Sequence, residues 1–142
     1  MLKLNVQAIE RLMKMITLQP NEAPVKISIV VPVYNEADNI VPLINEIISV
    51  MGDILTYEVI FVDDGSTDQT ALLLAHALTQ TKRLRVIRHL HCCGQSTSLH
   101  TGIKVARYPL IATLDGDGQN DPADIPRLCA LFLQQKAVTS RL

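Results

Sequence analysis

Short apolar runs alternate with segments of helical periodicity along most of the chain. Four runs, at residues 27–31, 59–62, 84–88 and 110–114, predict buried strands. Between and after them, apolar residues spaced three and four apart predict four helices. Their expected inner faces are Ile40, Leu43, Ile44, Ile47 and Met51, then Ala71, Leu74, Ala75 and Leu78, then Leu99, Gly102, Ile103 and Ala106, and last Ile125, Leu128, Cys129 and Phe132. This alternation predicts an α/β fold, a parallel sheet with helices on both faces.

Local signals predict where two of these helices begin. Ser66, followed three residues later by Gln69, has the pattern of a helix N-cap. Asp121 and Pro122 predict the N-cap and the first helical position of the last helix.

The first 25 residues differ from the rest of the chain. Their apolar residues recur at helical spacing with a few basic residues among them: Leu2, Lys3, Val6, Ile9, Arg11, Met13, Lys14 and Ile16. We therefore expect an N-terminal helical tail and linker over 1–25, before a domain that spans 26–142. The helix either packs on the domain or lies weakly on a membrane surface, and so few basic residues favour packing.

Composition narrows the class of protein. The 142 residues suffice for one domain, and a net charge of −1 argues against a nucleic-acid partner. Three cysteines without framework spacing favour a reduced, cytoplasmic setting. No apolar run reaches the roughly 18 to 20 residues of a transmembrane helix, so we expect a cytoplasmic chain, with a peripheral position at the membrane face left open.

Polar clusters follow three of the predicted strands. They read PVYNE at 32–36, DDGSTD at 63–68 and DGDGQNDP at 115–122. Ligands of open α/β sheets bind outside the carboxyl ends of the strands. The three clusters are therefore expected to face one crevice.

The third cluster predicts a divalent cation. Asp115 and Asp117 project to the same side of extended backbone, and two carboxylates that close need a cation or a shared proton. Oxygen ligands suit Mg²⁺ or Mn²⁺, and Gln119 is a candidate third ligand. Gly116 would let a ligand approach the backbone closely. The alternative is a glycine-rich loop whose Asp121 only caps the next helix.

The other two clusters each allow two interpretations. Gly65 and Ser66 are explained by a turn and a helix cap. Asp63 continues an apolar strand, which is costly without a partner, and its carboxylate suits an N–H of a nucleobase. Tyr34 is a candidate wall for a flat ring, whereas Glu36 also fits a charge at the start of a helix.

Three segments together resemble the family 2 glycosyltransferases: SIVVPVYNEADNI, EVIFVDDGSTDQT and LIATLDGDGQNDPADIPRL. Within that family they are most similar to the enzymes that transfer sugars to polyprenyl phosphates, such as the dolichol-phosphate mannosyltransferases. The resemblance covers about residues 26 to 135. It implies a GT-A fold, a Rossmann-like domain that binds a nucleoside-diphosphate sugar and a divalent metal.

Site residues follow from this resemblance. It implies a nucleotide-sugar site of Pro32, Tyr34, Glu36, Phe61, Asp63, Asp115, Gly116 and Asp117, with the metal on Asp115, Asp117 and Gln119. The expected function is metal-dependent transfer of a sugar from a UDP- or GDP-sugar to an acceptor, and the acceptor class we expect is a polyprenyl phosphate. No general base stands out, and a lipid phosphate needs none because its oxygen is already ionised near neutral pH. The alternative is a non-catalytic remnant that binds nucleotide or a protein partner.

Two departures from the family pattern add expectations. Relatives often carry Arg-Asn-x-Gly where this chain has HCCG at 91–94, which leaves any contact of that arginine in doubt. Zinc on His89, His91, Cys92 and Cys93 is the less favoured reading, against packed thiols. Family members also continue beyond this point, so the chain resembles an N-terminal part. We expect it to bind donor without transferring sugar, and to dimerise through an uncovered sheet edge.

Overall fold

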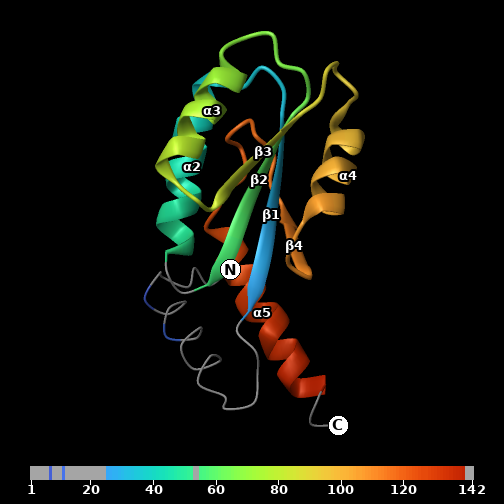
Figure 1. The fold of residues 1–142 in the computed structure, drawn as a ribbon. Coiled ribbons are helices and arrows are strands. Elements are labelled where there is room, and N and C mark those ends of the chain that lie inside the picture. Colours follow the sequence, from blue (N-terminus) through green and yellow to red (C-terminus); the bar gives the residue numbers. More distant parts are fainter. Residues whose placement is uncertain (1–6, 8–10, 12–24, 53–54, 140–142) are drawn as a thin grey trace.

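The structure, a computed structural model, describes residues 7, 11, 25–52 and 55–139. Its centre is a four-stranded parallel sheet in the order β3-β2-β1-β4 (Figure 1). The strands are β1 (Lys26–Val33), β2 (Thr56–Asp63), β3 (Leu84–Arg88) and β4 (Leu110–Thr113). The α/β prediction is confirmed. The tail and linker predicted over 1–25 lie almost entirely outside the described residues.

Four described helices cover the two faces of the sheet. They are α2 (Ala37–Met51), α3 (Thr70–Gln80), α4 (Gln95–Val105) and α5 (Asp124–Thr139). The larger core cluster joins α2, α3 and α5 to one face, with Phe61 and Ile29 fully buried at its centre. On the other face, Val30, Ile60 and Val62 pack with residues of α4 such as Leu99 (Figure 1). Helices therefore lie on both faces, as the apolar strands predict.

Strands β1 and β2 are longer than predicted, and the residues added to β2 include the buried Glu58. Glu58 is 4% exposed, and its Oε1 accepts the hydroxyl of Ser28 at 2.7 Å and the backbone N–H of Arg107 at 2.7 Å. Its Oε2 accepts a guanidinium N–H of Arg85 at 2.9 Å. Burial alone would raise the pKa of Glu58, but these donors hold it below its usual value. The network ties the α4–β4 connection to the sheet.

The predicted inner face is correct for α2 and only partly correct for α3. All five predicted residues of α2 are buried. In α3, Leu74 is buried, but Ala75 and Leu78 are exposed and Ala77 is buried instead. The face is rotated because the helix begins at buried Thr70, whose hydroxyl accepts the N–H of Glu36 at 3.0 Å.

The last two helices also differ in part from the prediction. In α4, Gly102 is buried and Leu99 packs inward, whereas Ile103 is 44% exposed. A Cβ on Gly102 would lie 2.3 Å from Cγ1 of Val30, so only glycine allows α4 to lie this close to the sheet. In α5, Ile125 and Cys129 are buried, while Leu128 and Phe132 are 62% and 49% exposed.

Both predicted helix starts are wrong in detail. Helix α3 begins at Thr70, and Ser66 does not cap it. The Ser66 hydroxyl instead accepts the N–H of Asn35 at 2.9 Å, which joins the loop after β2 to the loop after β1. Asp121 accepts the N–H of Ala123 at 2.9 Å in a turn that precedes α5.

Strand β4 lies at the edge of the sheet, where it pairs with β1. Between β4 and α5 runs an apolar groove of about 540 Å³, whose lining includes Leu110, Ala112, Leu128 and Phe132. A dimer through this edge stays a prediction. Among the described helices, none combines the length and the apolar character that a membrane crossing requires.

Candidate functional site

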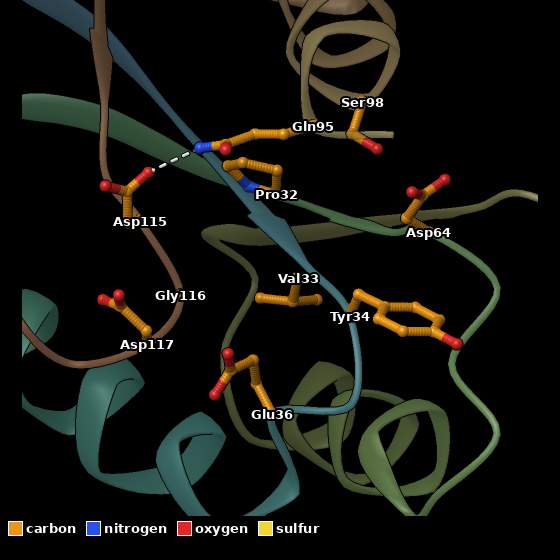
Figure 2. Close-up of a pocket in the computed structure, with 10 residues that line it drawn as sticks. All are labelled: Pro32, Val33, Tyr34, Glu36, Asp64, Gln95, Ser98, Asp115, Gly116 and Asp117. Carbon is orange, nitrogen blue, oxygen red and sulfur yellow. Dashed lines mark hydrogen bonds between the residues drawn. The ribbon is translucent and has the colours of Figure 1, made fainter. Parts of the chain in front are cut away.

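A cavity of about 250 Å³ opens at the ends of β1 and β2, beside the loop that follows β4 and the start of α4 (Figure 2). Its lining consists of Pro32, Val33, Tyr34, Glu36, Asp64, Gln95, Ser98, Asp115, Gly116 and Asp117. All three polar clusters found in the sequence contribute to it. The structure thus brings together six of the eight predicted nucleotide-sugar residues, namely Pro32, Tyr34, Glu36, Asp115, Gly116 and Asp117.

The loop after β4 places two carboxylates on the same side of this cavity (Figure 2). Oδ1 of Asp115 accepts a side-chain N–H of Gln95 at 2.8 Å, and Oδ1 of Asp117 accepts the backbone N–H of Gln119 at 3.0 Å. Neither carboxylate forms an ion pair with any described residue. Two exposed carboxylates without a counter-charge are a donor set that fits a hard divalent cation.

Glycine at position 116 holds this loop against β1. A Cβ there would lie 2.4 Å from Cγ1 of Val33 and 3.0 Å from the carbonyl oxygen of Pro32. The close approach brings both flanking aspartates to the end of β1. The side chain of Gln119 is not part of the cavity lining, and its role as a metal ligand stays a prediction.

The loop after β1 forms the opposite wall with Tyr34, whose side chain is 45% exposed (Figure 2). Asn35 follows with a φ of +50°, a conformation that asparagine tolerates better than most residues. Its Oδ1 accepts the backbone N–H groups of Thr67 at 2.8 Å and Asp68 at 3.3 Å. Asn35 therefore pins the two loops together, a role that the sequence analysis did not assign.

Asp63 lies beneath the cavity and does not line it. The residue is 0% exposed, its Oδ1 accepts the N–H of Ser66 at 2.9 Å, and its Oδ2 lies 3.4 Å from Nε of Arg88. Phe61 is likewise 0% exposed, in the core. Contacts of these two residues with a nucleoside stay predictions, because the structure places neither in the cavity wall.

Asp64, which was not among the residues predicted from the sequence, also lines the cavity. Its Oδ1 accepts the N–H of Cys93 and lies 2.7 Å from Nδ1 of His89, while its Oδ2 accepts the N–H of Gly94. Burial alone would raise the pKa of Asp64, but these donors and the thiol of Cys92 lower it to about 2. The signal available was strand alternation, since neighbouring residues of a strand point to opposite faces.

This pKa predicts an acid transition. A carboxyl with a lowered folded-state pKa stabilises the fold fully above the unfolded value, about 4, and loses that contribution as pH falls through about 2. The melting temperature of the protein should therefore exceed that of Asp64→Ala near neutral pH, and the gap should narrow between about pH 4 and pH 2. Melting curves across that range check this, and a gap independent of pH would contradict it.

The sequence model of the family described as Glycosyl transferase family 2 matches residues 28–141. The dodecaprenyl-phosphate galacturonate synthase of Rhizobium johnstonii is 41% identical over 108 residues, or 72% of this chain and 31% of that protein. The undecaprenyl-phosphate 4-deoxy-4-formamido-L-arabinose transferase of Yersinia enterocolitica is 40% identical over 110 residues, or 75% of this chain and 33% of that protein. The chain thus spans about a third of the length of these curated relatives.

Solved structures share the fold. The mannosyltransferase PcManGT from Pyrobaculum calidifontis, in complex with GDP-Man and Mn²⁺, aligns with a TM-score of 0.66 at 21% identity, over 88% of this chain and 39% of that one. S. aureus TarS 1-349, in complex with UDP-GlcNAc, aligns with a TM-score of 0.65 at 25% identity, over 78% of this chain and 32% of that one. The glycosyltransferase type of α/β fold is confirmed.

Proposed function

Because the chain belongs to glycosyl transferase family 2, we propose that it forms the nucleotide-sugar site of a metal-dependent glycosyltransferase. The observation that carries this proposal is the cavity of Figure 2. In this cavity Asp115 and Asp117, two carboxylates without a counter-charge, lie across from Tyr34 and Asp64. Tyr34 provides an aromatic ring there, and Asp64 provides another carboxylate. A nucleoside diphosphate bridged by a divalent cation complements that arrangement.

Asp115 and Asp117 would hold the metal, with Gln119 as a further candidate ligand. A Mg²⁺ or Mn²⁺ held there would supply Lewis-acid stabilisation of the negative charge on a departing diphosphate. Gln95 donates to Asp115 at 2.8 Å and so orients one carboxylate from the first turn of α4. The work of the protein here is positioning and electrostatic stabilisation.

Tyr34 and Asp64 would contact the nucleoside. Half of the Tyr34 side chain is exposed on the cavity wall, where a base can stack on it. The Asp64 carboxylate stays charged at neutral pH and accepts hydrogen bonds only, so it suits the ring N–H that both uracil and guanine carry. Pro32 and Glu36 complete this side of the cavity.

The acceptor we propose is a polyprenyl phosphate, the class after which both curated relatives are named. The second pKa of a phosphate is about 6, so its oxygen is an ionised nucleophile near neutral pH. Such an acceptor needs no general base. A substrate anchored in lipid would place the protein at the membrane face.

A nucleotide panel tests the donor assignment. UDP, GDP, ADP and the matching monophosphates are titrated into the protein with Mn²⁺ and, separately, with EDTA. We expect UDP or GDP to bind at least about tenfold more tightly with Mn²⁺, because Asp115 and Asp117 would hold the ion and its charge would attract the diphosphate. The affinities of the monophosphates should increase less with Mn²⁺ than those of the diphosphates. Equal affinities with Mn²⁺ and EDTA for every diphosphate would reject the proposal.

A further inference from the structure

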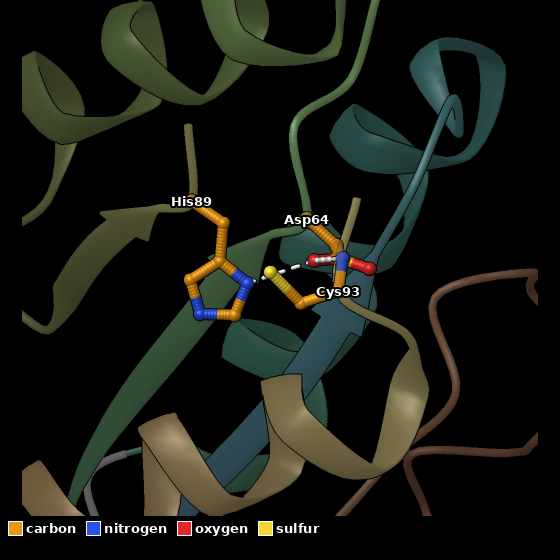
Figure 3. A group of neighbouring side chains, drawn as sticks. All are labelled: Asp64, His89 and Cys93. Atoms are coloured by element: carbon orange, nitrogen blue, oxygen red, sulfur yellow. Dashed lines mark hydrogen bonds and ion pairs between the residues drawn. The ribbon is translucent and has the colours of Figure 1, made fainter. Parts of the chain in front are cut away.

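Asp64, His89 and Cys93 bring a carboxylate, an imidazole and a thiol together beside the cavity (Figure 3). One ligand atom of each lies within 4.8 Å of the others. The three come from different segments, the ends of β2 and β3 and the loop before α4. This set differs in chemistry from Asp115 and Asp117, because it offers nitrogen and sulfur as well as oxygen.

The hydrogen bonds of His89 leave one ring nitrogen suited to a metal. Nε2 lies 2.9 Å from Oγ1 of Thr101, and that hydroxyl donates its single hydrogen to the carbonyl oxygen of Thr97 at 3.0 Å. The hydroxyl therefore accepts from Nε2–H, which directs Nδ1 at Asp64, 2.7 Å away. A metal ion at Nδ1 would replace the hydrogen that lies between ring and carboxylate: the N–H bond breaks, the nitrogen keeps the electron pair and the proton goes to solvent. Such a partner on the far nitrogen is the usual support of a metal-binding histidine.

The Cys93 thiol lies on the side from which an ion can enter, and as a thiolate it would balance part of the ion's charge. Cys93 is exposed, whereas Asp64 and His89 have side chains only 5% and 14% exposed, so an ion would enter from the side of Cys93. On binding, the Cys93 S–H bond breaks, the sulfur keeps the electron pair and the proton goes to solvent. One carboxylate and one thiolate then neutralise a divalent ion, which lowers the cost of burying it.

The neighbouring thiol has a different role. Sγ of Cys92 donates to the other carboxylate oxygen of Asp64, Oδ2, at 3.4 Å. Sγ of Cys93 contacts only the carbonyl oxygen of His91, at 3.2 Å, among its hydrogen bonds in the described chain. Cys93 can therefore turn toward an ion at small cost, and the fourth position falls to solvent.

We propose that Asp64, His89 and Cys93 form a second metal site, which takes Zn²⁺ or another thiophilic divalent ion. Mixed nitrogen, oxygen and sulfur ligands with one open position suit tetrahedral zinc. Asp64 also lines the cavity, so an ion here competes with nucleotide for the same carboxylate. That second effect rests on the proposed function, whereas the metal site itself does not.

Cobalt is the probe for the site. Co²⁺ titrated into the reduced protein should give visible bands of tetrahedral cobalt and a near-ultraviolet sulfur-to-cobalt charge-transfer band, at one ion per chain. Cys93→Ser should abolish the charge-transfer band. Cys92→Ser, which alters the adjacent thiol, and Cys129→Ser, in the core, should keep it. Thr101→Val should weaken Co²⁺ binding by roughly tenfold while circular dichroism stays unchanged.

A titration with Zn²⁺ tests whether the bound ion competes with nucleotide for Asp64. Zn²⁺ should weaken binding of UDP or GDP in the unmodified protein and leave Cys93→Ser unaffected. An absent charge-transfer band, or a band unchanged in Cys93→Ser, would overturn the site. If no nucleotide binds at all, the proposed function fails while the cobalt spectrum still decides this inference.

Discussion

Replacing Asp117 by alanine should remove most of the tightening that Mn²⁺ gives to a nucleoside diphosphate, a loss of at least about tenfold in affinity. Asp117 and Asp115 lie on one side of the cavity without a counter-charge among the described residues. Asp115 and Asp117 would hold the metal, and the substitution would remove one of these two carboxylates and its negative charge. Calorimetric titrations with Mn²⁺ and with EDTA measure the effect.

The matched control is Asp124→Ala. Asp124 is also exposed, but it lies at the start of α5 and pairs with Arg127 at 3.0 Å, outside the cavity lining. Its loss should leave both titrations unchanged. Because the Asp117 side chain accepts only a loop N–H, its removal should also leave the melting temperature almost unchanged. A variant that keeps the full Mn²⁺ effect would remove Asp117 from the metal site.

Alanine at the two adjacent aspartates should have different main effects, on stability for Asp63 and on nucleotide affinity for Asp64. Asp63→Ala removes a buried acceptor of the Ser66 N–H, so we expect a loss of about 1–3 kcal/mol in the free energy of unfolding and little change in nucleotide affinity. Asp64→Ala removes a carboxylate that lines the cavity, so nucleotide affinity should fall at least about tenfold. Denaturant unfolding and nucleotide titration on both variants separate these effects.

Asp64→Ala also frees the N–H groups of Cys93 and Gly94, so some stability is lost with it. A second variant, Cys92→Ser, disturbs the same loop more gently and should keep nucleotide affinity. Were Asp63→Ala to weaken nucleotide binding in folded protein while Asp64→Ala did not, the base-reading role predicted from the sequence would belong to Asp63.

Strands β1 and β2 were predictable because they contain buried runs that are apolar on both faces, as in any parallel sheet with two helical layers. Their ends were not, because Glu58 looks like a surface residue until Ser28, Arg85 and Arg107 are placed around it. The buried faces of the helices were harder to predict than the strands. The face of α3 depends on Thr70, whose hydroxyl serves a loop thirty-four residues earlier in the chain.

The convergence of the three polar clusters followed from parallel topology, and the cavity confirms it. What the sequence could not supply is the path of the loop between β3 and α4. That loop brings His89 and Cys93 to Asp64 from far along the chain. Asp63 ends β2 with its carboxylate beside Ser66 and Arg88, whereas Asp64 follows the strand and meets this loop.

The most direct test of the account is a crystal structure of this chain grown with Mn²⁺ and UDP or GDP, with anomalous scattering used to locate the metal. We predict a manganese peak bound by Asp115 and Asp117, with the diphosphate on the ion and the base between Tyr34 and Asp64. Manganese elsewhere, or a nucleotide outside the cavity at the ends of β1 and β2, would contradict it.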